Sequence, residues 1–260
     1  MAFLWLRLPK KRVVLAGVIA VSICALQMIQ LLKPIPAGNS PYTRWLSIDP
    51  FSFLPVIFFI LLPLIASIPA GTLLKNDVDS GLFAKVKLQS SLQKVMWSYI
   101  GIAFLTGFAI ITLALLLNFA FYFTVLPNIK PDNLLNSNIL LINQSTLLVS
   151  LYYAHPLLHA AISILFASTW AGLFSVFVTV TAIWIKNAFV AMSLGLVAQI
   201  VVLMLNSFIK LPNSVSYSPA DFLHEMAPTN VSLAVTGIVT LLMLIYCIAF
   251  SQIGVKHLVP

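Results

Sequence analysis

Six long runs of apolar residues, separated by shorter polar segments, dominate the hydropathy pattern of the chain. They cover residues 13–32, 51–70, 96–126, 157–185, 188–209 and 231–253. A helix rises about 1.5 Å per residue, so about 20 apolar residues cross the ~30 Å hydrocarbon core of a bilayer. The pattern therefore predicts an all-α polytopic membrane protein, with six transmembrane helices in a single transmembrane domain that covers residues 1–260.

Two segments at the membrane surface predict shorter helices. Residues 1–12 mix bulky apolar and basic side chains, and Pro9 separates them from the first long run, which favours an N-terminal interfacial helix. Residues 139–153 are too few to span a bilayer as a helix, so we expect an external helix that lies on the outer leaflet or dips into it. Counting this segment as a seventh span would instead place the C-terminus outside.

A short external helix is also predicted before the last span. Ser218 suits the N-cap, Pro219 the first helical position and Asp221 the third, so the helix is expected at residues 219–226.

The polar segment 71–95 carries the most concentrated positive charge between two apolar runs. Its apolar residues recur at roughly helical spacing, with lysines and serines between them: Leu74, Val78, Leu82, Val86 and Leu88. This spacing predicts a short amphipathic helix at the membrane surface. We interpret the segment as a contact surface for a soluble partner. The alternative is a solvated loop whose lysines only fix the orientation of the chain.

Composition agrees with a membrane protein and assigns its orientation. Of the 260 residues, 61% are hydrophobic and only 8% are charged, whereas soluble domains have about 25% charged residues. The net charge of +8 comes from basic residues that flank apolar runs, so the positive-inside rule explains it without nucleic acid as a partner. The four basic residues expected outside are Lys33, Arg44, Lys130 and Lys210, and the other lysines and arginines then lie in the cytoplasm with both termini.

The sequence lacks the residues that several membrane functions require. Every charged side chain is assigned to a loop or the end of a span, which leaves no carboxylate at membrane depth to couple an ion gradient. There is no phosphate-binding loop for ATP, and the histidines have no metal-ligand spacing, so we expect no catalytic residue and no metal site.

Polar side chains inside the predicted spans have two interpretations. They are Gln27, Gln30, Asn118, Gln199 and Asn206. Such groups form hydrogen bonds between transmembrane helices, or they line a substrate path, and the sequence alone leaves both open.

The order of these elements resembles the permease subunit of an ABC-2 type transporter. In that family the loop between spans two and three has an acid-x-x-x-Gly signature and forms a coupling helix. The sequence Asp77-Val78-Asp79-Ser80-Gly81-Leu82 stands at that place and is followed by the basic residues Lys85, Lys87 and Lys94. The chain departs from the family's commoner Glu and Gly-Thr pair, which here read Asp and Gly-Leu, and in its 139–153 segment.

The resemblance implies a partner ATPase and a second permease. Separate cytosolic nucleotide-binding subunits, which hold ATP and Mg²⁺, would dock on the coupling helix through Asp77, Asp79, Ser80, Gly81, Lys85 and Lys87. Two permease subunits, identical or different, would together export a peptide, lipid-linked or antibiotic-like molecule across a bacterial-type cell membrane. This chain itself would bind no cofactor. The alternatives are a membrane immunity or sensor-partner protein that does not transport, and a secondary carrier.

Overall fold

The computed structural model describes residues 2–29, 40–87, 91–132 and 145–257. Within these ranges there is no β-strand, and one isolated bridge joins Val215 and Asn230. Five helices are long and apolar enough to cross a membrane. They are α2 (Lys10–Ile29), α7 (Leu92–Val125), α10 (Pro156–Thr181, continued by the 3-10 turn η2, Ala182–Trp184), α11 (Ala188–Phe208) and α13 (Leu233–His257). The predicted all-α fold is confirmed for the described residues, and five of the six predicted spans contain a helix long and apolar enough to cross a membrane.

The run at residues 51–70, expected to be the second full span, contains a shorter helix. Helix α4 covers Leu54–Ser67, which is 14 residues, or about 21 Å. Pro55 stands in its first turn, and the helix ends before Pro69, which has no N–H to donate to the carbonyl four residues earlier. The hydropathy pattern did not show these ends because the turns on both sides of α4 are also apolar.

Other boundaries differ from the predicted spans by a few residues. Helix α2 begins directly after Pro9 and so includes three basic residues, while residues 30–32 of the predicted span lie outside the described ranges. Helix α7 has 34 residues and begins four residues before its predicted span, which makes it about 51 Å long. A helix of this length extends beyond the ~30 Å hydrocarbon core.

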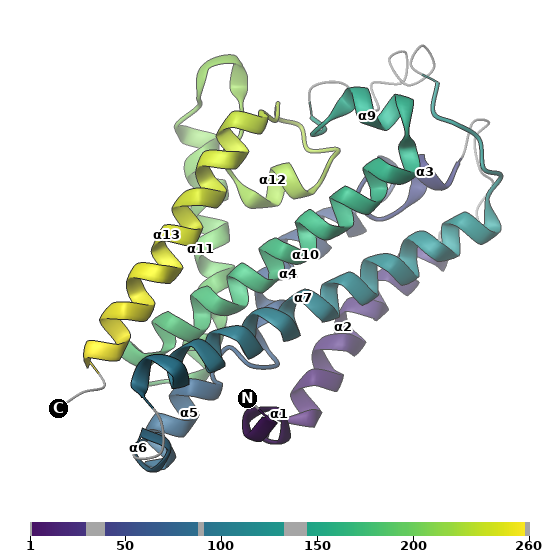
Figure 1. Cartoon of the computed structure of the whole chain (residues 1–260). Helices are drawn as coiled ribbons and strands as arrows, with labels where there is room; N and C mark the ends of the chain where they lie inside the picture. The colour runs from purple at the N-terminus through teal and green to yellow at the C-terminus, as the bar shows by residue number, and fades with distance from the viewer. Residues whose placement is uncertain (1, 30–39, 88–90, 133–144, 258–260) are drawn as a thin grey trace.

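The centre of the molecule is the contact between α7 and α10, which is the most extensive between any two elements. Helices α2 and α4 pack against this pair, and α11 packs mainly on α4 (Figure 1). Gly107 of α7 permits the close approach, because a Cβ at this position would lie 3.0 Å from the Ala171 carbonyl oxygen and from Ser175 Cβ. Helices α11 and α13 are the least buried of the five long helices, so they present apolar side chains outward.

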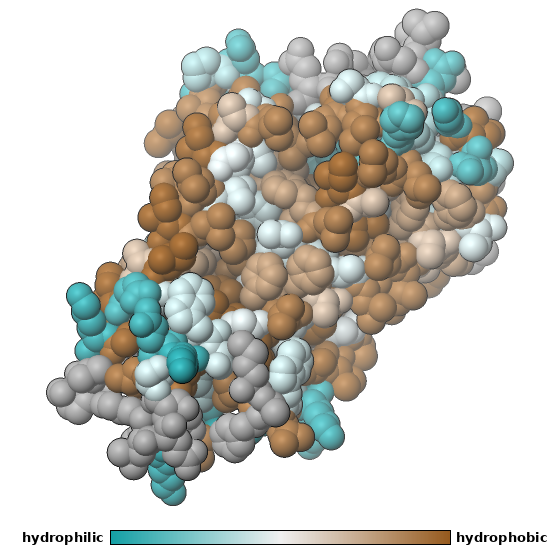
Figure 2. Space-filling view, in the orientation of Figure 1, coloured by the Kyte–Doolittle hydropathy of each residue, from teal (hydrophilic) through white to brown (hydrophobic). Residues whose placement is uncertain are grey.

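Short helices gather at the two ends of the bundle (Figure 1). The end named here the α5 end holds α1 (Ala2–Arg7), α5 (Leu73–Asp79), α6 (Leu82–Lys87) and both ends of the chain. The opposite α3 end holds α3 (Pro41–Arg44), α9 (Val149–Ala154) and α12 (Pro219–Leu223), with the 3-10 turn η3 (Pro212–Ser214) in the loop before α12. Figure 2 shows apolar residues over the middle of one face and hydrophilic residues toward its two ends.

The short helices match the sequence in part. The helix expected at 219–226 is present as α12, with Pro219 in its first turn. The N-terminal helix α1 is separate from α2, as Pro9 predicts. Residues 139–144 of the expected external helix lie outside the described ranges, and within the rest of that segment α9 has only six residues.

Gly107→Val is expected to lower the free energy of unfolding by about 1–3 kcal/mol, because the valine side chain would overlap the α10 backbone. Thermal unfolding in detergent checks this, with Gly17→Val on α2 as the control, since a Cβ there meets nothing within 4 Å. Equal melting temperatures for the two variants would contradict the close α7–α10 approach.

Candidate functional site

The segment that the sequence identified as a contact surface folds as two short helices. We call α5, the turn at Ser80 and Gly81, and α6 the α5–α6 hairpin. Gly81 has a φ of +72°, a left-handed conformation that glycine adopts without steric cost, and its N–H donates to the Val78 carbonyl at 3.0 Å. The single amphipathic helix predicted for this segment is therefore wrong, because Gly81 ends α5 and reverses the chain.

The apolar side of the hairpin packs on protein. Leu74 of α5 and Phe83 of α6 are buried together with Val95, Met96 and Tyr99 at the start of α7. Of the residues that gave the predicted spacing, Leu74 is buried and Val78 packs against the same cluster, so contact with the bundle explains this part of the pattern. The side chain of Val86 and residue Leu88 lie outside the described residues.

A buried carboxylate links the hairpin to two other helices. Asp77 Oδ2 lies 2.6 Å from Arg7 Nη1 on α1, and the Tyr99 hydroxyl on α7 donates to the same oxygen at 2.5 Å. Nearby, Arg12 Nη1 of α2 donates to Thr72 Oγ1 at 2.7 Å, just before α5 begins. Because charge-assisted hydrogen bonds away from water are strong and directional, movement of α5 is coupled to α1 and α7.

The predicted docking residues divide between the inside and the outside of the hairpin. Asp77 is buried. The side chain of Asp79 is 58% exposed, although it also pairs with the buried Lys75 Nζ at 2.7 Å. Ser80, Gly81 and Lys85 are exposed, while the side chain of Lys87 lies outside the described residues. Of the predicted set, Asp79, Ser80, Gly81 and Lys85 are therefore the residues that face outward.

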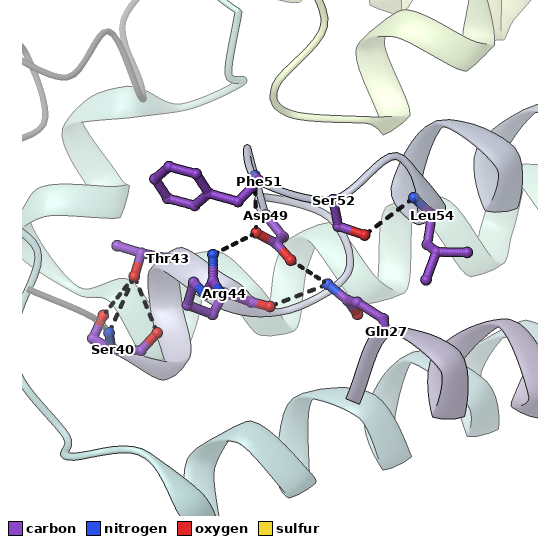
Figure 3. Close-up of polar contacts among 8 residues, drawn as sticks. All are labelled: Gln27, Ser40, Thr43, Arg44, Asp49, Phe51, Ser52 and Leu54. Carbon is purple, nitrogen blue, oxygen red and sulfur yellow. Dashed lines mark hydrogen bonds and ion pairs between the residues drawn. The ribbon is translucent and has the colours of Figure 1, made fainter. Parts of the chain in front are cut away.

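At the α3 end, four buried polar side chains form one network, which we call the Asp49 network. Figure 3 shows three of them, Gln27, Arg44 and Asp49. Asp49 accepts hydrogen bonds from Arg44 Nη1 at 3.1 Å and from Gln27 Nε2 at 3.0 Å. Gln27 Oε1 in turn accepts from Asn118 Nδ2 at 2.9 Å, and Asn118 Oδ1 accepts from the Leu46 N–H at 2.8 Å. Burial raises the pKa of Asp49, while the Gln27 amide, the Arg44 guanidinium and the Phe51 N–H act in the opposite direction.

This network shows that charged side chains which the sequence placed in a loop are buried. Arg44 and Asp49 are in the predicted loop, but the loop folds back into the bundle and buries both. The only sequence signals for this arrangement were the single polar residues Gln27 and Asn118 in otherwise apolar runs.

The remaining in-span polar residues also form hydrogen bonds between elements. Gln199 Nε2 of α11 donates to the carbonyl oxygens of Phe59 at 2.6 Å and Ile60 at 3.1 Å on α4. Pro63 has no N–H, so the Phe59 carbonyl has no partner four residues along the helix, and Gln199 supplies one. Asn206 Nδ2 donates to Asp221 Oδ2 at 3.2 Å. Gln30 lies outside the described residues, and a substrate path through these residues remains a prediction.

Two ionisable residues of the segment around α12, His224 and Glu225, are buried and Asp221 is partly buried, although the sequence placed all three in an external loop. Asp221 accepts hydrogen bonds from Asn206, Ser216 and Thr229. His224 stacks near Phe59, and burial lowers its pKa from 6.5 to about 4. In the described part of the chain, no three His, Cys, Asp or Glu side chains come together as a metal site.

Comparison with known proteins gives no match: no protein-family model, no curated protein and no solved structure corresponds to the chain.

Asp77→Ala is expected to lower the free energy of unfolding by roughly 2–3 kcal/mol. The change leaves the Tyr99 hydroxyl and Arg7 without their shared acceptor, and the loss is moderated because the Arg7 side chain is 30% exposed. Thermal unfolding in detergent measures it, with the exposed Lys85→Ala as the control, which should change stability by less than about 0.5 kcal/mol. Equal effects of the two substitutions would contradict the structural role of Asp77.

Acidification is expected to destabilise the fold through His224. Its pKa is 6.5 when unfolded and about 4 when folded, so the unfolded state takes up a proton first as the pH falls. The contribution of neutral His224 to stability is complete well above pH 6.5. Roughly 2–3 kcal/mol of it is lost as the pH falls from 7.5 to 4.5. His224→Gln should remove this part of the pH dependence of unfolding, whereas His155→Gln, at an exposed imidazole, should not. Identical profiles for wild type and His224→Gln would refute the assignment.

Proposed function

We propose that the chain is the membrane-spanning permease subunit of an ATP-driven exporter of the ABC-2 type. The observation that carries this proposal is the α5–α6 hairpin, which presents Asp79, Ser80, Gly81 and Lys85 at one end of the bundle. The same hairpin is held from within by Asp77. A soluble subunit that presses on the exposed side would therefore move α1 and α7 as well.

The distribution of charge supports a cytoplasmic location for the α5 end. Basic residues gather on the elements of this end: Arg7, Lys10, Lys11, Arg12, Lys75, Lys85, Lys94 and Lys256. The described basic residues toward the α3 end are Arg44, Lys130 and Lys210. Under the positive-inside rule both chain ends then lie in the cytoplasm.

The chain crosses the membrane six times only if the turns at the two ends of the short helix α4 complete the second crossing. Irregular backbone is tolerated at membrane depth where protein satisfies its polar groups. Before α4, the Leu46 and Phe51 N–H groups donate to Asn118 and Asp49, and Trp45 and Ile48 are buried. After α4, the Gly71 N–H donates to the Ser67 carbonyl at 2.8 Å. These contacts support a second crossing made of α4 and its flanking turns.

The energy for transport would come from partner subunits. Two nucleotide-binding subunits would hold ATP and Mg²⁺ and dock on the hairpin of each permease subunit. The apolar outer faces of α2, α11 and α13 would contact lipid or a second permease subunit. A peptide, lipid-linked or antibiotic-like molecule remains the proposed substrate class.

One observation favours the alternative of an immunity or sensor-partner protein. The α3 end is tied together by long-range hydrogen bonds, from Ser47 Oγ to the Leu223 carbonyl at 3.2 Å and from the Glu225 N–H to the Ser47 carbonyl at 3.1 Å. A folded surface of this kind is suited to binding an external protein.

A secondary carrier needs an ionisable group that exchanges its ion with solvent. Asp49 is buried but pairs with Arg44 and Gln27, so its charge is neutralised within the protein. This pairing argues against Asp49 as the ion-binding group of a carrier, because the ion would have to displace Arg44.

Exchanging the charges of Asp79 and Lys85 (Asp79→Lys with Lys85→Glu) is expected to abolish export and to reduce co-purification of the ATPase at least tenfold. The double change keeps the net charge, so membrane insertion should not change. The assay uses the chain expressed together with the ATPase that is encoded beside it, followed by pull-down and ATP hydrolysis.

Lys256→Glu at the same end of the bundle is the control and should leave docking intact. Unchanged ATPase recovery and activity with the exchanged pair would refute the docking role. The absence of a Walker-type ATPase gene beside this one would favour the immunity or sensor-partner alternative.

A further inference from the structure

A cavity of about 360 Å³ lies between α10, α12 and α13, within the ~300–1,000 Å³ range of small-molecule sites. Its lining includes Ile162 and Phe166 of α10, and it follows α13 from Leu233 to Leu244, a distance of about 16 Å along the helix. Figure 1 shows α13 beside α10, with α12 at the α3 end of the space. Leu233, Leu241 and Ile162 are exposed, so the cavity is open at the side of the bundle.

The walls are apolar, but Glu225 and His159 lie at the α3 end of the cavity. Glu225 Oε2 is 3.7 Å from His159 Nε2, and both side chains are at least 95% buried. His159 Nε2 also lies 2.9 Å from the Leu147 carbonyl oxygen, which only accepts, so Nε2 carries the hydrogen and donates it there.

The backbone of Glu225 is held by hydrogen bonds, whereas one oxygen of its side chain receives no hydrogen bond from the described residues. Its N–H donates to the Ser47 carbonyl at 3.1 Å, and its carbonyl accepts from Thr146 Oγ1 at 2.8 Å. Ser163 forms a hydrogen bond with the side chain, yet none of the described residues donates one to Oε2. A buried acceptor in this state is costly, and native proteins place partners beside nearly all such groups.

A cation would pair with the Glu225 side chain in its charged form. Burial raises the pKa of the Glu225 carboxyl, which favours its neutral form, while His159 and Ser163 act in the opposite direction. The neighbouring His224 is uncharged at neutral pH because burial lowers its pKa to about 4. An ammonium group at Oε2 would supply both the missing hydrogen-bond donor and the opposite charge, and so would favour the carboxylate form.

We propose that this cavity binds an amphipathic primary ammonium compound that enters from the membrane, with its alkyl chain along α10 and α13 and its ammonium group on Glu225 Oε2. The inference goes beyond the proposed function, because it holds whether or not the chain transports anything. Two sources share this chemistry: the headgroup of phosphatidylethanolamine and a single-chain amine.

Photolabelling of the full chain in phosphatidylcholine nanodiscs tests the site. The probe is a dodecyl amine that carries a diazirine on its chain, and the matched probe is the corresponding dodecyl alcohol. The amine is expected to label peptides from α10 and the first half of α13 at least fivefold more than the alcohol does. Equal labelling by both probes, or even labelling of all outward-facing helices, would overturn the proposal.

Glu225→Gln is expected to remove the preference for the amine and leave labelling by the alcohol unchanged. Asp221→Asn is the matched control, because Asp221 is a nearby, partly buried carboxylate that does not line this cavity. Persistence of the amine preference in Glu225→Gln would refute the assigned headgroup contact.

Filling the cavity provides a second test that does not remove a buried charge. A Cβ at Gly237 of α13, which lines the cavity, meets nothing within 4 Å, so Gly237→Leu should fold and block both probes. Gly17→Leu on α2 is the control, since its Cβ also meets nothing. Undiminished amine labelling in Gly237→Leu would overturn the location.

Adding phosphatidylethanolamine to the nanodiscs distinguishes the sources. Loss of amine labelling through competition assigns the site to the lipid headgroup, and retained labelling assigns it to a single-chain amine.

Discussion

The structure depends on satisfying polar groups where water is excluded. A membrane helix satisfies its own backbone, but residues 40–72, the described chain between α2 and α5, do not form a full helical span. Its polar groups are therefore satisfied by side chains from neighbouring helices. Asn118 of α7 accepts from the Leu46 N–H, and Gln199 of α11 donates to the carbonyl that Pro63 leaves free. A few amide side chains of the long helices α7 and α11 thus hold the short apolar helix α4 and the turn before it in place.

The two ends of the bundle use buried charge differently. At the α5 end, Asp77 joins three helices and leaves the opposite side of the hairpin exposed. At the α3 end, Arg44 and Asp49 neutralise each other inside a closed network. A buried pair of this kind contributes little net stability, because desolvation offsets the attraction, but it permits few alternative arrangements of the groups around it. The contacts of Asp77 are suited to passing movement of the hairpin to α1 and α7, whereas the Asp49 network is suited to holding the α3 end fixed.

The sequence predicts the helices better than their contacts. Hydropathy found each long helix, Pro9 separated α1 from α2, and Pro219 marked the start of α12, because these signals are local. The short extent of α4 was missed, since the turns around it are as apolar as the helix. Hydropathy records how apolar a residue is and not whether its backbone is helical.

The predicted contact segment stays a prediction as a docking site, but the structure shows how its residues are oriented. It folds as two short helices with a turn at Gly81, and sequence spacing did not distinguish Asp77, which is buried, from Asp79, which is mostly exposed. That difference arises from Arg7 and Tyr99, which are 70 and 22 residues away and meet Asp77 only in the folded chain. Non-local pairing of this kind leaves no periodic signal in a single sequence.

The same reasoning separates the buried carboxylates that the sequence assigned to loops. Asp49 has a guanidinium, an amide and a backbone N–H as partners, and the partly buried Asp221 has two hydroxyls and an amide. Glu225 differs, because one of its oxygens faces an apolar cavity without a donor from the described residues. The proposed ammonium site rests on this difference: the hydrogen bonds that hold the backbone of Glu225 in place leave one oxygen of its side chain at the cavity wall.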